Sequence, residues 1–219
     1  MQEIVFNHKP VLFEETIESL GIRPDGTYID GTAGGGGHSG AILERLTTGK
    51  LLSIDRDPDA IAVVRARLSK YPGSIVAMGN FSEMDRIAAE HGISSADGVL
   101  LDIGVSSFQL DTAERGFSYH SDAPLDMRMS KSGTSAADLV NTLSWQQLAE
   151  IISRYGEDKS AARIAKGIVA AREKKPIETT AELAEIVRES VPAAVRRAEG
   201  HPARRPVQAL RIAVNGGLD

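Results

Sequence analysis

The sequence contains no cysteine among its 219 residues. This absence excludes disulfide bonds, thiolate metal sites and cysteine nucleophiles, and it fits a reducing compartment, so we expect a cytoplasmic protein. The chain also lacks an apolar run long enough to span a bilayer, and residues 1–4 lack the basic start of a signal peptide. We therefore expect no association with a membrane, and no residue pattern suggests a metal site.

Positive charge is scarce in the first part of the chain. Residues 1–153 carry 12 Lys and Arg against 21 Asp and Glu, whereas residues 154–211 carry 13 against 8. A basic region on an acidic protein is typical of a polyanion-binding surface. A solvated helix surface explains the charge alone more simply, so the polyanion interpretation needs other support.

Short apolar segments alternate with helical patterns over the first half of the chain. We expect strands at residues 27–30, 51–55, 74–78 and 98–102, and helices at 15–20, 38–46, 59–68 and 84–90. Near-continuous apolar strands that alternate with helices predict an α/β fold with a doubly wound parallel sheet. Residues 104–135 then form a long loop, and helices follow with caps expected at Ser144 and Thr180.

A glycine-rich segment follows the first expected strand. Five glycines occur within residues 34–40, and Gly35, Gly37 and Gly40 fit the spacing of nucleotide-binding turns. Glycine lets ligand atoms approach the main chain closely. The match is weak by itself, because such a turn can also be an ordinary tight loop.

Polar or aromatic residues also follow the other expected strands. Asp55, Phe81 and Asp102 come at or after the ends of the second, third and fourth strands. In an open α/β sheet the ligand lies beyond these carboxyl ends, where an acid can accept ribose hydroxyls and a ring can border a base. Each residue also has an ordinary explanation as a helix cap, a strand end or a core ring. Taken together, they favour a ligand that contains a nucleoside.

The charge of the loop favours one nucleoside ligand over another. Asp30 opens the glycine loop, where it would repel the pyrophosphate of a dinucleotide. S-adenosylmethionine carries a sulfonium and an α-amino group and no phosphate, so Asp30 and Asp102 suit it better. This favours a methyltransferase over an NAD-linked oxidoreductase, which stays open as an alternative.

Several motifs in sequential order resemble one known family. They cover residues 8–12 (HKPVL), 30–39 (DGTAGGGGHS), 52–58 (LSIDRDP), 101–111 (LDIGVSSFQLD), 114–118 (ERGFS), 124–129 (PLDMRM), 155–157 (YGE) and 208–215 (QALRIAVN). In these motifs the chain resembles the bacterial ribosomal RNA small subunit methyltransferase H family over nearly its whole length. The resemblance implies a Rossmann-like methyltransferase sheet with an all-helical insertion after the fourth strand.

The resemblance also implies an activity and a set of cofactor contacts. The activity is transfer of a methyl group from S-adenosyl-L-methionine to the N4 amine of a cytosine in the decoding region of 16S rRNA. The cofactor-binding positions are those that match the family motifs: Gly36, Gly37, His38, Asp55, Phe81, Asp102 and Gln109.

The resemblance gives the basic region a purpose. We expect a cofactor-binding domain at residues 1–108, with 207–219 packed back on it, and a helical RNA-recognition domain at 109–206. Because Lys and Arg neutralise backbone phosphates, we expect contacts to 16S rRNA or the small ribosomal subunit from Arg163, Lys166, Arg172, Lys174 and Lys175. For any one of them, a solvated helix surface explains the charge nearly as well.

The expected reaction is a direct displacement in which the protein positions both partners. The cytosine must be unstacked, and its amine can lose a proton after transfer, so no strong base is needed. Asp102 is the candidate catalytic residue, because its carboxylate can accept a hydrogen bond from the amine and orient it.

The family differs from this chain at the C-terminal end. It continues beyond the position that matches Asn215, which leads us to expect an exposed edge on the fourth strand and a possible homodimer through it. A truncated, catalytically inactive relative that binds cofactor or RNA is the alternative function.

Overall fold

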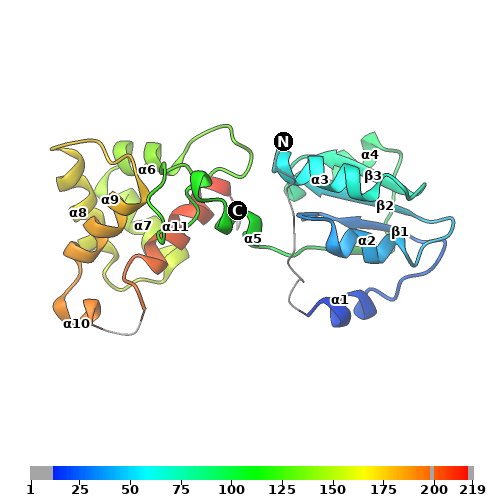
Figure 1. Cartoon of the computed structure of the whole chain (residues 1–219), viewed down its shortest axis with the longest axis horizontal. Helices are drawn as coiled ribbons and strands as arrows, with labels where there is room; N and C mark the ends of the chain where they lie inside the picture. Colours follow the sequence, from blue (N-terminus) through cyan, green and yellow to red (C-terminus); the bar gives the residue numbers. More distant parts are fainter. Residues whose placement is uncertain (1–11, 198–199, 217–219) are drawn as a thin grey trace. The chain divides into compact units, whose positions relative to one another are not determined.

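The computed structural model describes residues 12–197 and 200–216. The chain divides into two compact units, Met1–Gly104 and Val105–Asp219, which are drawn in Figure 1. The boundary therefore falls at residue 104, four residues before the predicted end of the cofactor-binding domain. The motif at residues 8–11 lies outside the described residues.

The first unit is an alternation of strands and helices, as predicted. Each expected strand is present, and the four expected helices begin and end within three residues of the prediction. The elements are α1 (Phe13–Ser19), β1 (Thr27–Asp30), α2 (Gly37–Leu43), β2 (Lys50–Asp55), α3 (Pro58–Leu68), β3 (Ser74–Met78), the 3₁₀ turn η1 (Phe81–Glu83), α4 (Met84–Glu90) and β4 (Gly98–Leu100).

The four strands form one parallel sheet in the order β3-β2-β1-β4. The chain moves outward from β1 to β3 and then returns to place β4 on the other side of β1. The strand order thus reverses between β1 and β4, and in open α/β sheets ligands bind at this switch point, beyond the carboxyl ends of the strands. This confirms the predicted Rossmann-like α/β fold and fixes the edge where a ligand is expected.

Helices cover the two faces of the sheet unequally. One face packs against α1, α2 and α3 through a cluster that contains Ile17, Ile42 and Val64. The other face packs against α4, and there the β4 side chain of Val99 is 46% exposed. β4 is an edge strand, as predicted, with apolar side chains exposed beside it. Self-association through this edge stays a prediction.

The described part of the second unit is helical. It contains α5 (Ser107–Asp111), the 3₁₀ turn η2 (Ala113–Arg115), α6 (Ala136–Thr142), α7 (Trp145–Gly156), α8 (Ala161–Arg172), α9 (Thr180–Ser190), α10 (Ala193–Arg196) and α11 (Arg204–Asn215). Among the described residues of the whole chain, none of the helices combines the length and apolar character that crossing a bilayer requires.

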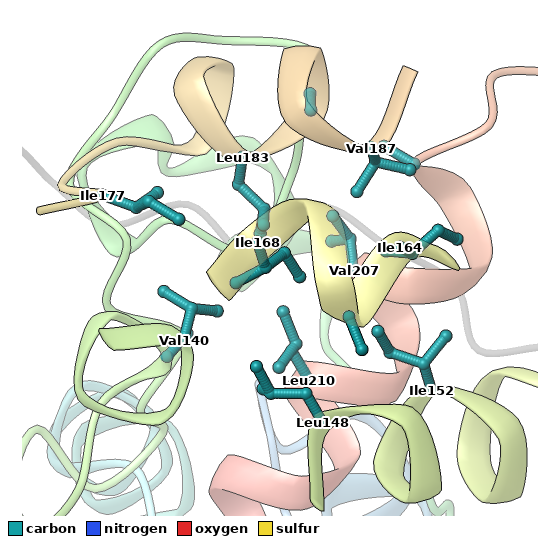
Figure 2. Close-up of a cluster of buried hydrophobic side chains, with 14 of the residues drawn as sticks. Val140, Leu148, Ile152, Ile164, Ile168, Ile177, Leu183, Val187, Val207 and Leu210 are labelled. Carbon is teal, nitrogen blue, oxygen red and sulfur yellow. The ribbon is translucent and has the colours of Figure 1, made fainter. Parts of the chain in front are cut away.

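The last helix packs inside the helical unit. Val207 and Leu210 of α11 are buried in a cluster with Leu148, Ile152 and Ile164 from α7 and α8 (Figure 2). The structure thus groups α11 with the helical unit, whereas the prediction grouped residues 207–219 with the cofactor-binding domain. The apolar stripe of α11 packs chiefly against α7 and also contacts α6; residues 217–219 lie outside the described residues.

Local capping explains where the helices begin. Ser144 caps α7 through a reciprocal capping box with Gln147, as predicted for this serine. The cap of α9 is Thr179, not Thr180; Thr180 is buried, and its hydroxyl donates to the carbonyl of Ser121. The expected loop at residues 104–135 contains α5 and η2, which are too short to give a periodic pattern.

Leu210 provides a test of the core of the helical unit. Because its side chain is fully buried, Leu210→Ala should lower the free energy of unfolding by about 2–5 kcal/mol. Trp145, the single tryptophan, belongs to the same unit, so its fluorescence during urea unfolding reports this loss. The control is Gln208→Ala, an exposed change on the same helix. A loss no larger than that of the control would place α11 outside the core.

Candidate functional site

The loop between β1 and α2 lies over the carboxyl edge of the sheet and is fastened on both sides. On the β2 side, the amide of Gly34 donates to Asp55 Oδ2 at 2.7 Å. On the β4 side, the amide of Asp102 donates to Thr32 Oγ1 at 2.7 Å. The backbone is left-handed at Gly34 and Gly36, with φ of 51° and 75°, which a glycine adopts without strain. The loop is thereby held at the switch point.

Asp30 is fully buried beneath this loop and belongs to a polar network. Its Oδ1 accepts a hydrogen bond from the amide of Thr32 at 3.1 Å, and its Oδ2 accepts one from the Ser39 hydroxyl at 2.7 Å. Ser39 also shares a hydrogen bond with Ser53 of β2. Burial raises the pKa of the Asp30 carboxyl to about 6, although both hydrogen bonds oppose the shift. A cation at this edge would favour the ionised carboxylate.

Asp55 ends β2 with its carboxylate turned toward the loop. Besides Gly34, it accepts a hydrogen bond from the amide of Asp57 at 2.9 Å. Burial raises the pKa of the Asp55 carboxyl in spite of these hydrogen bonds. Each carboxylate oxygen can accept about two hydrogen bonds, so Asp55 keeps acceptor capacity for a ribose hydroxyl beside the backbone amides that it already binds.

Phe81 lies against the start of the glycine segment. A Cβ atom placed on Gly31 would come within 3.0 Å of Phe81 Cβ and 2.5 Å of Leu101 Cδ2. The absence of a side chain at position 31 thus allows the ring after β3 and the leucine after β4 to approach the end of β1. Phe81 is half-buried, which leaves part of its apolar surface at the same edge as Asp55.

His38 brings an unsatisfied polar atom to the loop. Its side chain is buried, and its ring stacks on Phe13 with centroids 5.3 Å apart. Nε2 is inaccessible to solvent and has no hydrogen-bond partner among the described residues. Burial lowers the pKa of His38, although the nearby charge of Asp102 acts in the opposite direction. The lowered pKa keeps the imidazole neutral at pH 7. A buried polar atom without a partner is unfavourable by about 1–3 kcal/mol, and a ligand group could satisfy it.

The structure places Asp55, Phe81 and Asp102 at or after the carboxyl ends of β2, β3 and β4, and Gly36, Gly37 and His38 after that of β1. Asp102 is exposed at the end of β4. Gln109 belongs to the second unit, where its side-chain Oε1 accepts from the Ser106 amide in a capping box. Sequence reasoning missed Thr32, Ser39 and Ser53. The sequence does indicate a buried role for Ser39, because a serine on the apolar side of a helix needs a hydrogen-bond partner inside the protein.

A cavity of about 360 Å³ opens among α1, α2 and α3. It is lined by Gly37 of the glycine loop and by residues such as Phe13, Arg45 and Tyr71, whereas Asp55, Phe81 and Asp102 do not line it. Its lining thus lacks the acids that point to a nucleoside. No group of His, Asp and Glu that could hold a metal ion occurs within the part of the chain that the structure describes.

The predicted RNA-binding side chains in the second unit differ in their contacts. Arg163 and Lys166 are exposed on α8, and Lys166 Nζ lies 4.8 Å from the centre of the Trp145 ring. Lys174 is exposed as well. By contrast, Arg172 donates to the carbonyl of Val140 at 2.7 Å, and Lys175 forms an ion pair of 2.7 Å with a glutamate.

The sheet order, the glycine loop and the acids at the carboxyl edge define a Rossmann-like α/β domain with a candidate ligand site at the switch point. The sequence profile of the MraW methylase family matches residues 5–219, and the chain belongs to this family.

Two curated relatives are similar to this chain over 98% of its length. A ribosomal RNA small subunit methyltransferase H from Lachnospira eligens is 54% identical over 217 residues. A protein of the same name from Symbiobacterium thermophilum is 50% identical over 218 residues. The chain spans 69% of the length of each relative.

Proposed function

We propose that this chain transfers a methyl group from S-adenosyl-L-methionine to the N4 amine of a cytosine in the decoding region of 16S rRNA. The observation that carries the proposal is the acidic switch point, where the glycine loop is hydrogen-bonded to Asp55 at the end of β2. Membership of the MraW methylase family and the names of the relatives support the reaction class. The rRNA substrate is expected in the cytoplasm.

The residues at the switch point fit this cofactor chemically. Asp55 would accept a ribose hydroxyl, and Phe81 would border the adenine. The backbone of Gly36 and Gly37 would lie against the cofactor, with the free Nε2 of His38 available as a hydrogen-bonding group. Asp30 and Asp102 would provide negative charge near the sulfonium and amino groups. Gln109 is a further proposed contact that rests on the family motif alone.

When bound, the cofactor supplies an electrophilic methyl group. The methyl group would pass from the sulfonium to the cytosine amine, with the S–CH₃ bond breaking as the N–CH₃ bond forms, and the amine would release its proton to solvent. The work of the protein is to hold the unstacked base and the donor in line. We assign the orientation of the amine to Asp102, whose exposed carboxylate at the end of β4 can accept its hydrogen bond.

The proposal is tested by methyl transfer from tritiated cofactor to small-subunit rRNA, followed by nucleoside analysis. The expected product is N4-methylcytidine. Label in another nucleoside would overturn the assigned acceptor, and label in no nucleoside, with cofactor binding retained, would favour an inactive binding module.

Asp102 can be examined in the same assay. Asp102→Asn should lower kcat about 10- to 100-fold, because an amide both accepts and donates and so orients the amine less well. Asp85→Asn removes an exposed carboxylate from α4 and serves as the control. Full turnover of the Asp102 variant with unchanged cofactor affinity would show that Asp102 does not orient the amine.

A further inference from the structure

Arg211 of α11 is a half-buried cation in the helical unit. Its Nη1 donates to the carbonyl of Phe117 at 3.1 Å, and no carboxylate of the described residues pairs with it. Burial lowers the pKa of the Arg211 guanidinium, and the group that opposes this shift is Tyr119. A guanidinium has five N–H donors, and a desolvated one is costly without an anion. Among the described residues, the guanidinium of Arg211 therefore has a carbonyl as its hydrogen-bond partner and no anion.

A stack of aromatic rings lies next to Arg211. The centroid of the Tyr119 ring lies 4.3 Å from that of the His120 ring and 4.9 Å from that of the His201 ring. The Tyr119 and His201 rings are stacked, with an angle of 20° between their planes. Both histidines are exposed, and His201 Nδ1 accepts a hydrogen bond from the amide of Ala203. The stack thus joins the loop after η2 to the segment that precedes α11, and its outer rings are accessible. Flat rings at a surface are platforms on which unpaired RNA bases stack.

The chain around this stack is basic. Residues 196–216 contain five arginines, Arg196, Arg197, Arg204, Arg205 and Arg211, against a single acid, Glu199. Glu185, the acid whose charge acts on His201, pairs with Arg188. Positive charge beside a stacking surface is the combination with which proteins bind single-stranded nucleic acid.

We propose that Tyr119, His201 and Arg211 form a nucleotide-binding site for the single-stranded part of the RNA substrate. A base stacks on the exposed ring of His201, which the Tyr119 ring supports from behind, and the guanidinium of Arg211 takes a neighbouring phosphate. The site rests on the proposed function for the identity of its RNA. It differs from the surface predicted on α8, where Arg172 and Lys175 already have partners within the protein.

The experiment measures binding of the full chain to two labelled probes by fluorescence anisotropy. One probe is a 12-nucleotide oligocytidylate RNA, and the other is an abasic strand with the same backbone. Tyr119→Leu should weaken binding of the oligocytidylate about 10-fold and leave the abasic strand unchanged, because only bases stack. Tyr71→Leu removes a tyrosine from the first unit and is the matched control.

Arg211→Gln should weaken binding of both probes about equally. The slope of log affinity against log salt should fall by about 0.7, the value for one phosphate contact on a single strand. Arg65→Gln removes an exposed charge from α3 and is the control. Should Arg211→Gln fail to fold, Arg211→Lys replaces it, with an unchanged salt slope expected. His201→Ala, a change at an exposed ring, should repeat the base-dependent loss.

Two results would overturn the site. One is a Tyr119 variant that binds both probes as the Tyr71 control does, and the other is an Arg211→Gln variant that keeps the wild-type salt slope. Methyl transfer measured on the same preparations separates this site from the proposed function. Wild-type protein that binds oligocytidylate through these residues but transfers no methyl group would support the site and contradict the function.

Discussion

Replacing Asp55 with alanine is expected to weaken binding of S-adenosyl-L-methionine about 10- to 100-fold. The carboxylate is the group at the end of β2 that can accept a ribose hydroxyl, and a hydrogen bond to a charged acceptor contributes about 1.5–3 kcal/mol. One such bond corresponds to a change of about 10- to 100-fold in the dissociation constant. Isothermal titration calorimetry measures the loss directly.

The same substitution also removes an internal contact, which must be separated from the lost ligand contact. Asp55 Oδ2 accepts from the Gly34 amide, so its loss releases one side of the glycine loop. Asp55→Asn keeps an acceptor for that amide and should bind the cofactor more weakly than wild type but more tightly than Asp55→Ala. Asp85→Ala is the control for loss of an acidic residue. Wild-type affinity in Asp55→Ala would mean that the cofactor does not use this strand end.

The sheet and its ligand edge could be predicted from the sequence because their signals are local. Each strand is a short apolar segment that ends near a turn, and the acids at 30, 55 and 102 follow directly. Parallel strands then carry these residues to one edge without further information. The polar network beneath the loop could not be predicted, because the contact of Ser39 with Ser53 depends on the packing of α2 against β2.

The helical unit was harder to predict because several of its conspicuous motif residues are structural. Asn215 is buried; its Nδ2 donates to the carbonyl of Met127, and its Oδ1 accepts from the amide of Met129. Arg115 donates to the carbonyls of Arg128 and Met129. The Asn215 bonds hold the loop that precedes α6 against α11, and the Arg115 bonds tie the same loop to η2. The sequence shows α11 as an amphipathic helix, but only the partners of its apolar side decide which unit it joins.

The stability of the sheet unit is expected to depend on pH through Asp30. The unfolded chain binds a proton at this carboxyl near pH 3.8, whereas burial raises the pKa to about 6 in the folded chain. The folded chain therefore holds the extra proton between these values, and the free energy of unfolding falls as pH rises through them. Because Asp30 is fully buried, the whole loss amounts to about 3 kcal/mol by pH 7.5.

Asp30→Asn should remove this loss. An amide can still accept from the Thr32 amide and can donate to Ser39, so the network is retained without a charge. At pH 7.5 the variant should be more stable than wild type. The difference in the free energy of unfolding between variant and wild type should be about 1–2 kcal/mol larger at pH 7.5 than at pH 5. Urea unfolding followed by circular dichroism measures the difference, while Trp145 fluorescence reports the helical unit separately.

The comparison between the two pH values isolates Asp30 from other acids. Burial also raises the pKa of Asp55, so part of the pH dependence of the wild type persists in the Asp30 variant. Asp85→Asn, on the exposed surface of α4, should show no pH-dependent advantage. If Asp30→Asn raised the free energy of unfolding by the same amount at pH 5 and at pH 7.5, the Asp30 carboxyl of the folded wild type would be ionised at both pH values. The glycine loop would then rest on a permanent negative charge, and a bound cation would gain more from it.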